Sequence, residues 1–145
     1  MTQSTDPFAQ RQHKLRELIG LGYEPYPRKF EYSHTPTAIR AQYDATAAAE
    51  LAAGKVTVRT CGRIMRLRPH GKAGFLDISD GEHNVQVYVR QDAVGPEGFK
   101  LFELFDLGDI VGTEGTLFRT RTNELTVQAT KLYFLAKNLL PLPEK

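Results

Sequence analysis

Hydrophobic residues recur at helical spacing over the first third of the chain and at alternating positions over most of the rest. Asp6 can cap a first helix, and Gly20 ends it. The segment Pro25-Tyr26-Pro27 cannot continue a helix and predicts an extended connector. The segments predicted to be helical are Asp6 to about Ile19, Thr35 or Thr37 to Tyr43, and an alanine-rich stretch from Ala45 to Ala53 that closes at Gly54.

After Gly54 the pattern predicts β-strands. Val56 and Val58 alternate with polar residues, as in a half-buried strand. Gly62 interrupts this phase and predicts a bulge or a strong bend inside a long first strand. Further strands are predicted over 75–79, 85–89, 110–118 and 124–135, with a short helix, introduced by Pro96 and Gly98 and bearing Phe99, Phe102 and Phe105 as core residues, between the second and the third of these.

Three strands, a short helix and two more strands form the element order of an OB-fold, a five-stranded Greek-key barrel. We therefore expect a mainly β (α+β) protein with an N-terminal helical extension over residues 1–54 and the barrel over residues 55–137. Pro141 and Pro143 stiffen the last segment, 138–145, which is typical of a linker toward a further domain.

Composition narrows the class of protein. The 145 residues are 41% hydrophobic and 25% charged, as in an ordinary globular domain. Cys61 is the only cysteine, so an intrachain disulfide and a thiolate cluster for zinc are excluded. Neither a membrane-spanning apolar run nor a signal peptide is recognisable. We expect a cytoplasmic location and no membrane partner.

Positive charge is concentrated rather than general, because the net charge is only +2. A strip without acidic residues holds Lys55, Arg59, Arg63, Arg66, Arg68, His70 and Lys72, and a predicted strand with Phe75 follows it. Cations that meet phosphates beside a ring that stacks on a base suit a single-stranded nucleic acid. Arg63, Arg66 and Lys72 are candidate contacts to the RNA backbone. Arg11 and Lys14 on the first helix are either a second such contact or a solvated helix face.

Strand alternation selects the residues that could read a base. If Leu76 and Ile78 point into the barrel, Phe75 points outward, and the same rule turns Gln86 and Tyr88 outward on the next strand. On the last strand it places Glu124, Thr126 and Gln128 outside. Phe75 could then stack on a base, Gln86 could match the edge of an unpaired uracil, and Arg68 could bind phosphate or a carbonyl. Glu124 could accept from a base or orient an arginine. Exposed Phe and strand Gln are also common without any such role.

The ordered set of motifs resembles the N-terminal anticodon-binding domain of class II lysyl-tRNA synthetases. The resemblance runs from about residue 8 to the C-terminus. The motifs are Pro25-Tyr26-Pro27 with Phe30, Gly62-Arg63-Ile64-Met65, Gly71-Lys72-Ala73-Gly74-Phe75, Val85-Gln86-Val87-Tyr88, Leu107-Gly108-Asp109-Ile110, Phe118-Arg119-Thr120, Glu124-Leu125 and the exit Leu135-Ala136-Lys137-Asn138-Leu139-Leu140-Pro141-Leu142-Pro143-Glu144-Lys145.

That resemblance implies an anticodon-binding site for tRNA-Lys. It assigns base stacking to Phe75, uracil recognition to Gln86, base and backbone contacts to Arg68, and the family's carboxylate to Glu124. The chain departs from the usual pattern at two positions, Gly74 in place of Ser and Asn123 in place of Gly. Asn can still adopt a left-handed turn.

The resemblance also implies that the complete enzyme ligates lysine to tRNA with ATP and Mg²⁺ in a separate catalytic domain, and that it is a homodimer. The chain itself shows no P-loop, no metal-ligand spacing and no nucleophile–base pair. We therefore expect a non-catalytic module that has no cofactor of its own.

Three alternatives remain open. The first is an OB module that binds any single strand, and the second is an assembly role through the first helix or the Tyr26-Pro27 segment. The third is the related barrel of an aspartyl- or asparaginyl-tRNA synthetase, which shares the Phe and the Gln but not the Pro-Leu-Pro exit.

Overall fold

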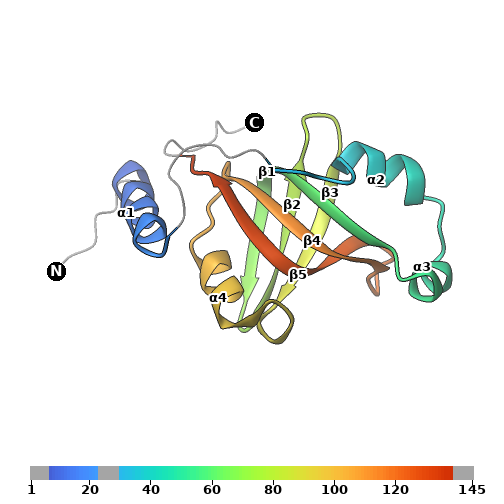
Figure 1. The fold of residues 1–145 in the computed structure, drawn as a ribbon. Helices are drawn as coiled ribbons and strands as arrows, with labels where there is room; N and C mark the ends of the chain where they lie inside the picture. The colour runs from blue at the N-terminus through green and yellow to red at the C-terminus, as the bar shows by residue number, and fades with distance from the viewer. Residues whose placement is uncertain (1–6, 23–29, 139–145) are drawn as a thin grey trace.

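The computed structural model describes residues 7–22 and 30–138 (Figure 1). The helices are α1 (Pro7–Gly20), α2 (Pro36–Tyr43), α3 (Ala48–Gly54) and α4 (Gln91–Glu103), and the strands are β1 (Thr57–His70), β2 (Ala73–Ser79), β3 (Asn84–Arg90), β4 (Ile110–Arg119) and β5 (Leu125–Ala136). This order confirms the predicted one. Thr35 caps α2, since its side chain accepts a hydrogen bond from the Ala38 amide. The Asp6 cap, the connector at residues 25–27 and the exit from residue 139 lie outside the described residues.

The strands close into a barrel in the order β1-β2-β3-β5-β4, which confirms the predicted five-stranded OB-fold. Among the strand pairs of the described residues, β3–β5 alone is parallel. The long strand β1 serves two neighbours, because Thr57–Arg63 pairs with β4 and Arg63–His70 pairs with β2. One continuous strand can therefore turn the corner of the barrel.

The barrel core consists of the apolar side chains that alternation turns inward. All of the predicted inward residues of β2, β3 and β5 are buried: Leu76, Ile78, Val85, Val87, Val89, Leu125, Val127 and Ala129. Full burial of an aliphatic side chain stabilises the fold by about 1.5–3 kcal/mol. The helix α4 lies at one end of the barrel (Figure 1), where its Phe99 and Phe102, together with Phe105 just beyond it, are buried as predicted.

Two local predictions need correction. The register shift in β1 falls at Met65, between Ile64 and Arg66, and not at Gly62. Gly62 is needed for a close approach instead, since a Cβ there would lie 2.6 Å from the carbonyl oxygen of Ser79. The helix before β4 begins at Gln91 rather than at Pro96. Its backbone breaks at Gly95, which has φ 83°, so Pro96 begins only its second segment.

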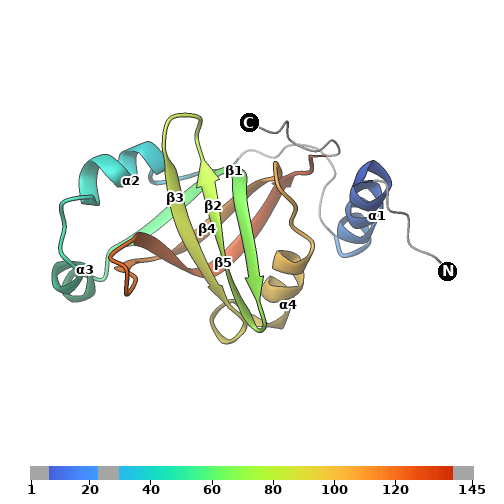
Figure 2. The same ribbon diagram turned by 180° about the vertical axis from the view of Figure 1, so that it is seen from behind.

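The helices leave one face of the barrel open. Figure 2 shows the outer face of β1, β2 and β3 with no described helix in front of it, with α2 and α3 to one side and α1 and α4 to the other. This open face is the one to which alternation turned the candidate base-reading residues.

Among the described residues, no helix has the length and apolarity that a membrane span requires.

Candidate nucleic-acid interface

Strand register places the predicted base-reading residues in two adjacent rows on the open face. The first row runs from Arg68 through Phe75 and Tyr88 to Gln128, and the second from Arg66 through Asp77 and Gln86 to Thr126. Directly opposed residues on neighbouring strands lie on the same side of a sheet. The structure therefore brings Arg68, Phe75 and Gln86 together, as the sequence predicted.

Aromatic rings form the centre of this face. The Phe75 and Tyr88 rings stack at 4.7 Å between centroids with an interplanar angle of 29°, and Phe118 is tilted against Tyr88 at 6.2 Å. The Arg68 guanidinium carbon lies 5.8 Å from the Phe75 ring centroid, within the range of a cation–π contact. Sequence reasoning selected Phe75 but assigned no role to Phe118, which β4 brings in from the far side of β5.

A hollow of about 640 Å³ opens over these rings. Its lining residues are Arg68, Pro69, His70, Phe75, Gln86, Tyr88, Phe118, Thr120, Arg121 and Thr122. A second hollow, of about 650 Å³, lies at the β1–β2 turn and is lined by Lys72, Arg90 and the first residues of α4. No aromatic side chain lines the second hollow, so only the first combines stacking surfaces, an amide and cations.

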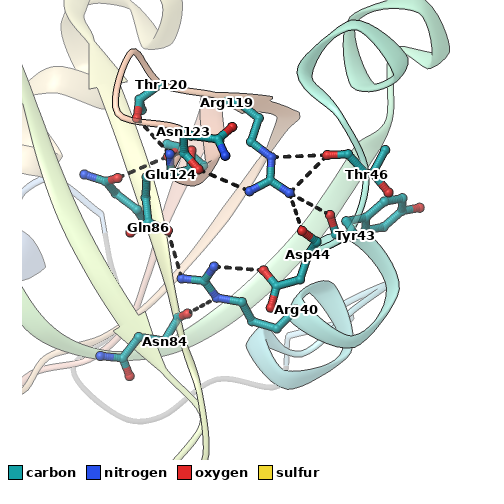
Figure 3. A network of polar contacts seen from close by, with 11 residues as sticks. Arg40, Tyr43, Asp44, Thr46, Asn84, Gln86, Arg119, Thr120, Asn123 and Glu124 are labelled. Atoms are coloured by element: carbon teal, nitrogen blue, oxygen red, sulfur yellow. Dashed lines mark hydrogen bonds and ion pairs between the residues drawn. The ribbon is translucent and has the colours of Figure 1, made fainter.

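Glu124 is turned toward α2 rather than into the hollow. Its Oε2 accepts a hydrogen bond from Arg40 Nη2 at 3.1 Å, and Arg40 also donates to Asp44 Oδ1 at 3.1 Å and to the carbonyl of Asn84 at 2.8 Å (Figure 3). Burial disfavours the charge of Arg40, but the hydrogen bonds and charges of Asp44 and Glu124 outweigh it and raise the pKa of Arg40. Glu124 therefore contacts an arginine in this structure, and its contact to a base stays a prediction.

A second arginine fastens the β4–β5 hairpin to the end of α2. Arg119 donates to the carbonyl oxygens of Tyr43, Asp44 and Thr46, and also to that of Asn123 in the hairpin (Figure 3). A cation beside the last carbonyls of a helix is favourable. Asn123 has φ 65°, so it does adopt the left-handed conformation that usually favours glycine. The helical extension therefore supports the edge of the interface.

The sequence analysis assigned no role to Arg40 or Arg119. Arg40 lies 84 residues from Glu124, and Arg119 up to 76 residues from its partners on α2. No local pattern reports contacts of that separation.

The structure also explains why glycine, and not serine, occupies position 74. A Cβ at this position would lie 2.5 Å from Cζ of Phe102. The ring of α4 therefore occupies the space that a serine side chain would need.

The predicted contacts to the RNA backbone do not form one cluster. Arg66 is exposed and lies 3.9 Å from Asp77, whereas Arg63 donates to the carbonyl of Gly108 at 2.9 Å. Lys72 lines the second hollow. On α1, Arg11 donates to the carbonyl of Leu107 and Lys14 pairs with Asp106.

The five cations fall into two groups, two on α1 and three on or next to β1. Arg11 and Lys14 hold α1 against the barrel, away from the aromatic face. Their contact to RNA, like those of Arg63, Arg66 and Lys72, stays a prediction.

One carboxylate interrupts the positive charge of the open face. Asp77 lies directly opposite Gln86 and is 19% exposed. Burial raises the pKa of Asp77, against the opposing effect of the positive charges of Arg66 and Arg68. Asp77 would repel a phosphate, so the middle of the second row, at Asp77 and Gln86, favours the edge of a base over the backbone.

An OB barrel with stacked rings, an amide and arginines on one open face defines a nucleic-acid-binding domain. Over residues 58–135 the chain matches the tRNA anti-codon family, an OB-fold nucleic acid binding domain, and it belongs to that family.

Curated relatives agree with the motifs in the sequence. The chain is 44% identical to a lysine–tRNA ligase of Moorella thermoacetica over 140 residues, 97% of this chain and 27% of that protein. It is 41% identical to the lysine–tRNA ligase of Listeria monocytogenes over 97% of this chain and 28% of the relative, and 40% identical to that of Staphylococcus epidermidis over 99% and 29%. The predicted resemblance is thereby confirmed. The chain spans less than a third of the length of these relatives.

Proposed function

We propose that this domain binds the anticodon loop of tRNA-Lys and reads its uridine-rich anticodon by base stacking and hydrogen bonding. The observation that carries the proposal is the stacked pair Phe75–Tyr88 on the open face, with Arg68 and Gln86 beside it. Unpaired bases offer a π-face to such rings and a Watson–Crick edge to a neighbouring amide. The relatives, which are lysine–tRNA ligases, supply the choice of tRNA.

Each residue has a distinct task in this proposal. Phe75 stacks on the middle base, and Gln86 hydrogen-bonds its edge. Arg68 holds the adjoining phosphate or a base carbonyl. Glu124, ion-paired to Arg40, fixes the β4–β5 hairpin at the border of the hollow.

The complete protein would be a cytoplasmic, homodimeric class II ligase that joins lysine to tRNA. In it, ATP and Mg²⁺ would act in a catalytic domain outside this chain. Within the described residues, no group of three or more His, Cys, Asp or Glu side chains could hold a metal ion. The task of this domain would be tRNA recognition.

The test is binding of the protein to a tRNA-Lys anticodon stem-loop, with the middle uridine intact or changed to cytidine, at two salt concentrations. We expect a clear loss of affinity on the single-base change at both concentrations. Equal, strongly salt-dependent binding of both loops would support the alternative, a module that accepts any single strand.

Replacing Gln86 with Ala should mainly remove discrimination at the middle base. The two loops should then bind within about threefold of each other, because a bidentate base contact provides about 1–3 kcal/mol of discrimination. The measurement is the ratio of the two dissociation constants, with thermal unfolding as the check on folding. A uniform loss for both loops with a lowered Tm would indicate a damaged fold and contradict the assigned role.

Replacing Arg66 with Gln should reduce the slope of log K against log salt by about 1, because each phosphate contact releases condensed counterions. Arg66 is 63% exposed and only weakly paired with Asp77, so its charge is available. Lys100 is exposed on helix α4, which lies to one side of the open face (Figure 2), so Lys100→Gln is the control for the loss of one positive charge and should leave the slope unchanged. An unchanged slope for Arg66→Gln would remove this contact from the proposal.

A further inference from the structure

Thr126 occupies an unusual position on the open face. It belongs to the row that contains Gln86, and alternation predicted that its side chain lies outside the barrel. The residue is fully buried, with 0% exposure. The predicted side of the sheet is confirmed by the pairing of Thr126 with Gln86, although the side chain is shielded from solvent. A hydroxyl buried in this way requires hydrogen-bond partners.

The hydroxyl of Thr126 has two acceptors. Its Oγ1 lies 3.2 Å from Oε1 of Gln86 and 3.1 Å from the carbonyl oxygen of Glu124. The carbonyl oxygen of Glu124 and the amide oxygen of Gln86 can only accept hydrogen bonds. The single hydroxyl proton of Thr126 is therefore shared between these two oxygens in a bifurcated hydrogen bond.

In this contact the oxygen of the Gln86 amide faces Thr126. Figure 3 shows the side-chain oxygen directed at the network and the nitrogen directed away from it. In the described part of the chain, the Nε2 group donates to no protein atom. Its two N–H groups are therefore left to a ligand in the hollow that Gln86 lines.

We propose that Thr126 is a positioning residue for base selectivity, which holds Gln86 so that it presents a donor to the base. The inference rests on the proposed function of this face. Uracil carries an acceptor at C4, its carbonyl oxygen, whereas cytosine carries a donor there, its amino group. An outward N–H matches uracil and opposes cytosine. Discrimination of this kind comes from the mismatched partner as much as from the matched one.

Without the hydroxyl, the amide could rotate by half a turn. Its oxygen would then face the hollow and accept from the amino group of cytosine. Because Thr126 is buried, it acts on the base only through Gln86. Its loss should therefore change selectivity more than affinity.

The experiment compares Thr126→Val, which keeps the shape and loses the hydroxyl, with Thr126→Ser, which keeps the hydroxyl. Dissociation constants are measured for anticodon stem-loops with uridine or cytidine at the middle position. We expect Thr126→Val to lower the preference for uridine by about tenfold, through tighter binding of the cytidine loop, and Thr126→Ser to keep the wild-type preference.

A second readout needs no RNA. In ¹⁵N-labelled free protein, the side-chain NH₂ signals of Gln86, identified by their loss in Gln86→Ala, should move in Thr126→Val and remain in place in Thr126→Ser.

Unmoved Gln86 signals in Thr126→Val would overturn the inference whatever the RNA results are. An unchanged preference in that variant, or an equal loss for both loops, would also overturn it. A wild-type protein that binds both loops equally would instead overturn the proposed function, and the inference with it. The NMR comparison distinguishes that failure from a misassigned Thr126.

Discussion

Replacing Lys137 with Met is expected to lower the free energy of unfolding by about 3–5 kcal/mol, the cost of leaving a buried charge without its partner. Lys137 is 1% exposed, and its Nζ donates to Oδ2 of Asp109 at 2.7 Å and to Oδ2 of Asp106 at 2.9 Å. Asp109 has no exposure at all. Met fills a similar volume, so the loss would come from the uncompensated carboxylate rather than from a cavity. Urea unfolding at neutral pH measures it.

The loss of unfolding free energy in Lys137→Met should become smaller at acidic pH. Burial raises the pKa of Asp109, while the charge of Lys137 acts in the opposite direction. A carboxyl whose pKa is higher in the folded state binds more protons there, so its contribution to stability falls as pH rises from the ordinary Asp value through the raised one. Removing Lys137 extends this window upward. Below the ordinary value Asp109 is protonated in both states, and the variant should approach the wild type.

Asp106 also makes the stability difference between Lys137→Met and the wild type smaller in acid. Burial would raise its pKa, but hydrogen bonds from Lys14 and Lys137 lower it below the ordinary value. Its stabilisation is therefore present above the unfolded pKa and is lost as pH falls through the folded one. Part of that stabilisation is already missing in Lys137→Met. The gap to wild type narrows in acid for this reason also.

Asp109→Asn completes a double-mutant cycle with Lys137→Met. The double variant should lose less stability than the sum of the two single variants, because it contains no unpaired buried charge. Strict additivity, or a deficit that is constant with pH, would contradict the ion pair as the source of the effect.

The parts of the fold that sequence predicted are those with a local cause. Alternation fixed the facing of Leu76 and Ile78, and with them that of Phe75 between the two, because successive side chains of a strand point to opposite sides. The same rule predicted that Gln86 points to the outside of the barrel. The start of α2 was predicted at Thr35 or Thr37, and the structure places the cap at Thr35, whose side chain accepts from a backbone amide only three residues away.

What sequence could not predict depends on contacts across the fold. The parallel pairing of β3 with β5 buries Thr126 beside Gln86, 40 residues away, and α2 brings Arg40 to Glu124. The cationic strip is contiguous in sequence but spreads over a long strand, in which Arg63 turns to Gly108 and Arg66 stays on the open face. Glycine at position 62 signalled a backbone irregularity, yet close approach to β2 is what requires it.

Replacing Phe75 with Ala is expected to weaken anticodon-loop binding by about 1–3 kcal/mol, a loss of roughly 5- to 150-fold, while the fold is retained. The ring lies outside the barrel core, so its removal leaves the buried apolar set intact. It takes away one member of the Phe75–Tyr88 stack and the surface over which Arg68 lies. Titration of the stem-loop measures the loss, and thermal unfolding checks that the Tm is unchanged.

Phe75→Leu and Phe75→Tyr identify what the ring supplies. Leu keeps apolar volume without a π-face, whereas Tyr keeps the planar ring. Tyr should restore binding and Leu should not. Equal binding by all three variants would contradict stacking at this position, and restoration by Leu would reduce the role to an apolar contact.

The Phe75 and Gln86 variants should also fail differently. Every base has a π-face, so the loss of Phe75 should weaken the uridine and cytidine loops alike and leave their ratio close to that of the wild type. Loss of Gln86 should change the ratio instead. A face that is built from adjacent stacking and hydrogen-bonding residues can in this way separate affinity from selectivity. If both variants changed affinity and ratio together, the two residues would act as one unit rather than in the separate tasks assigned to them.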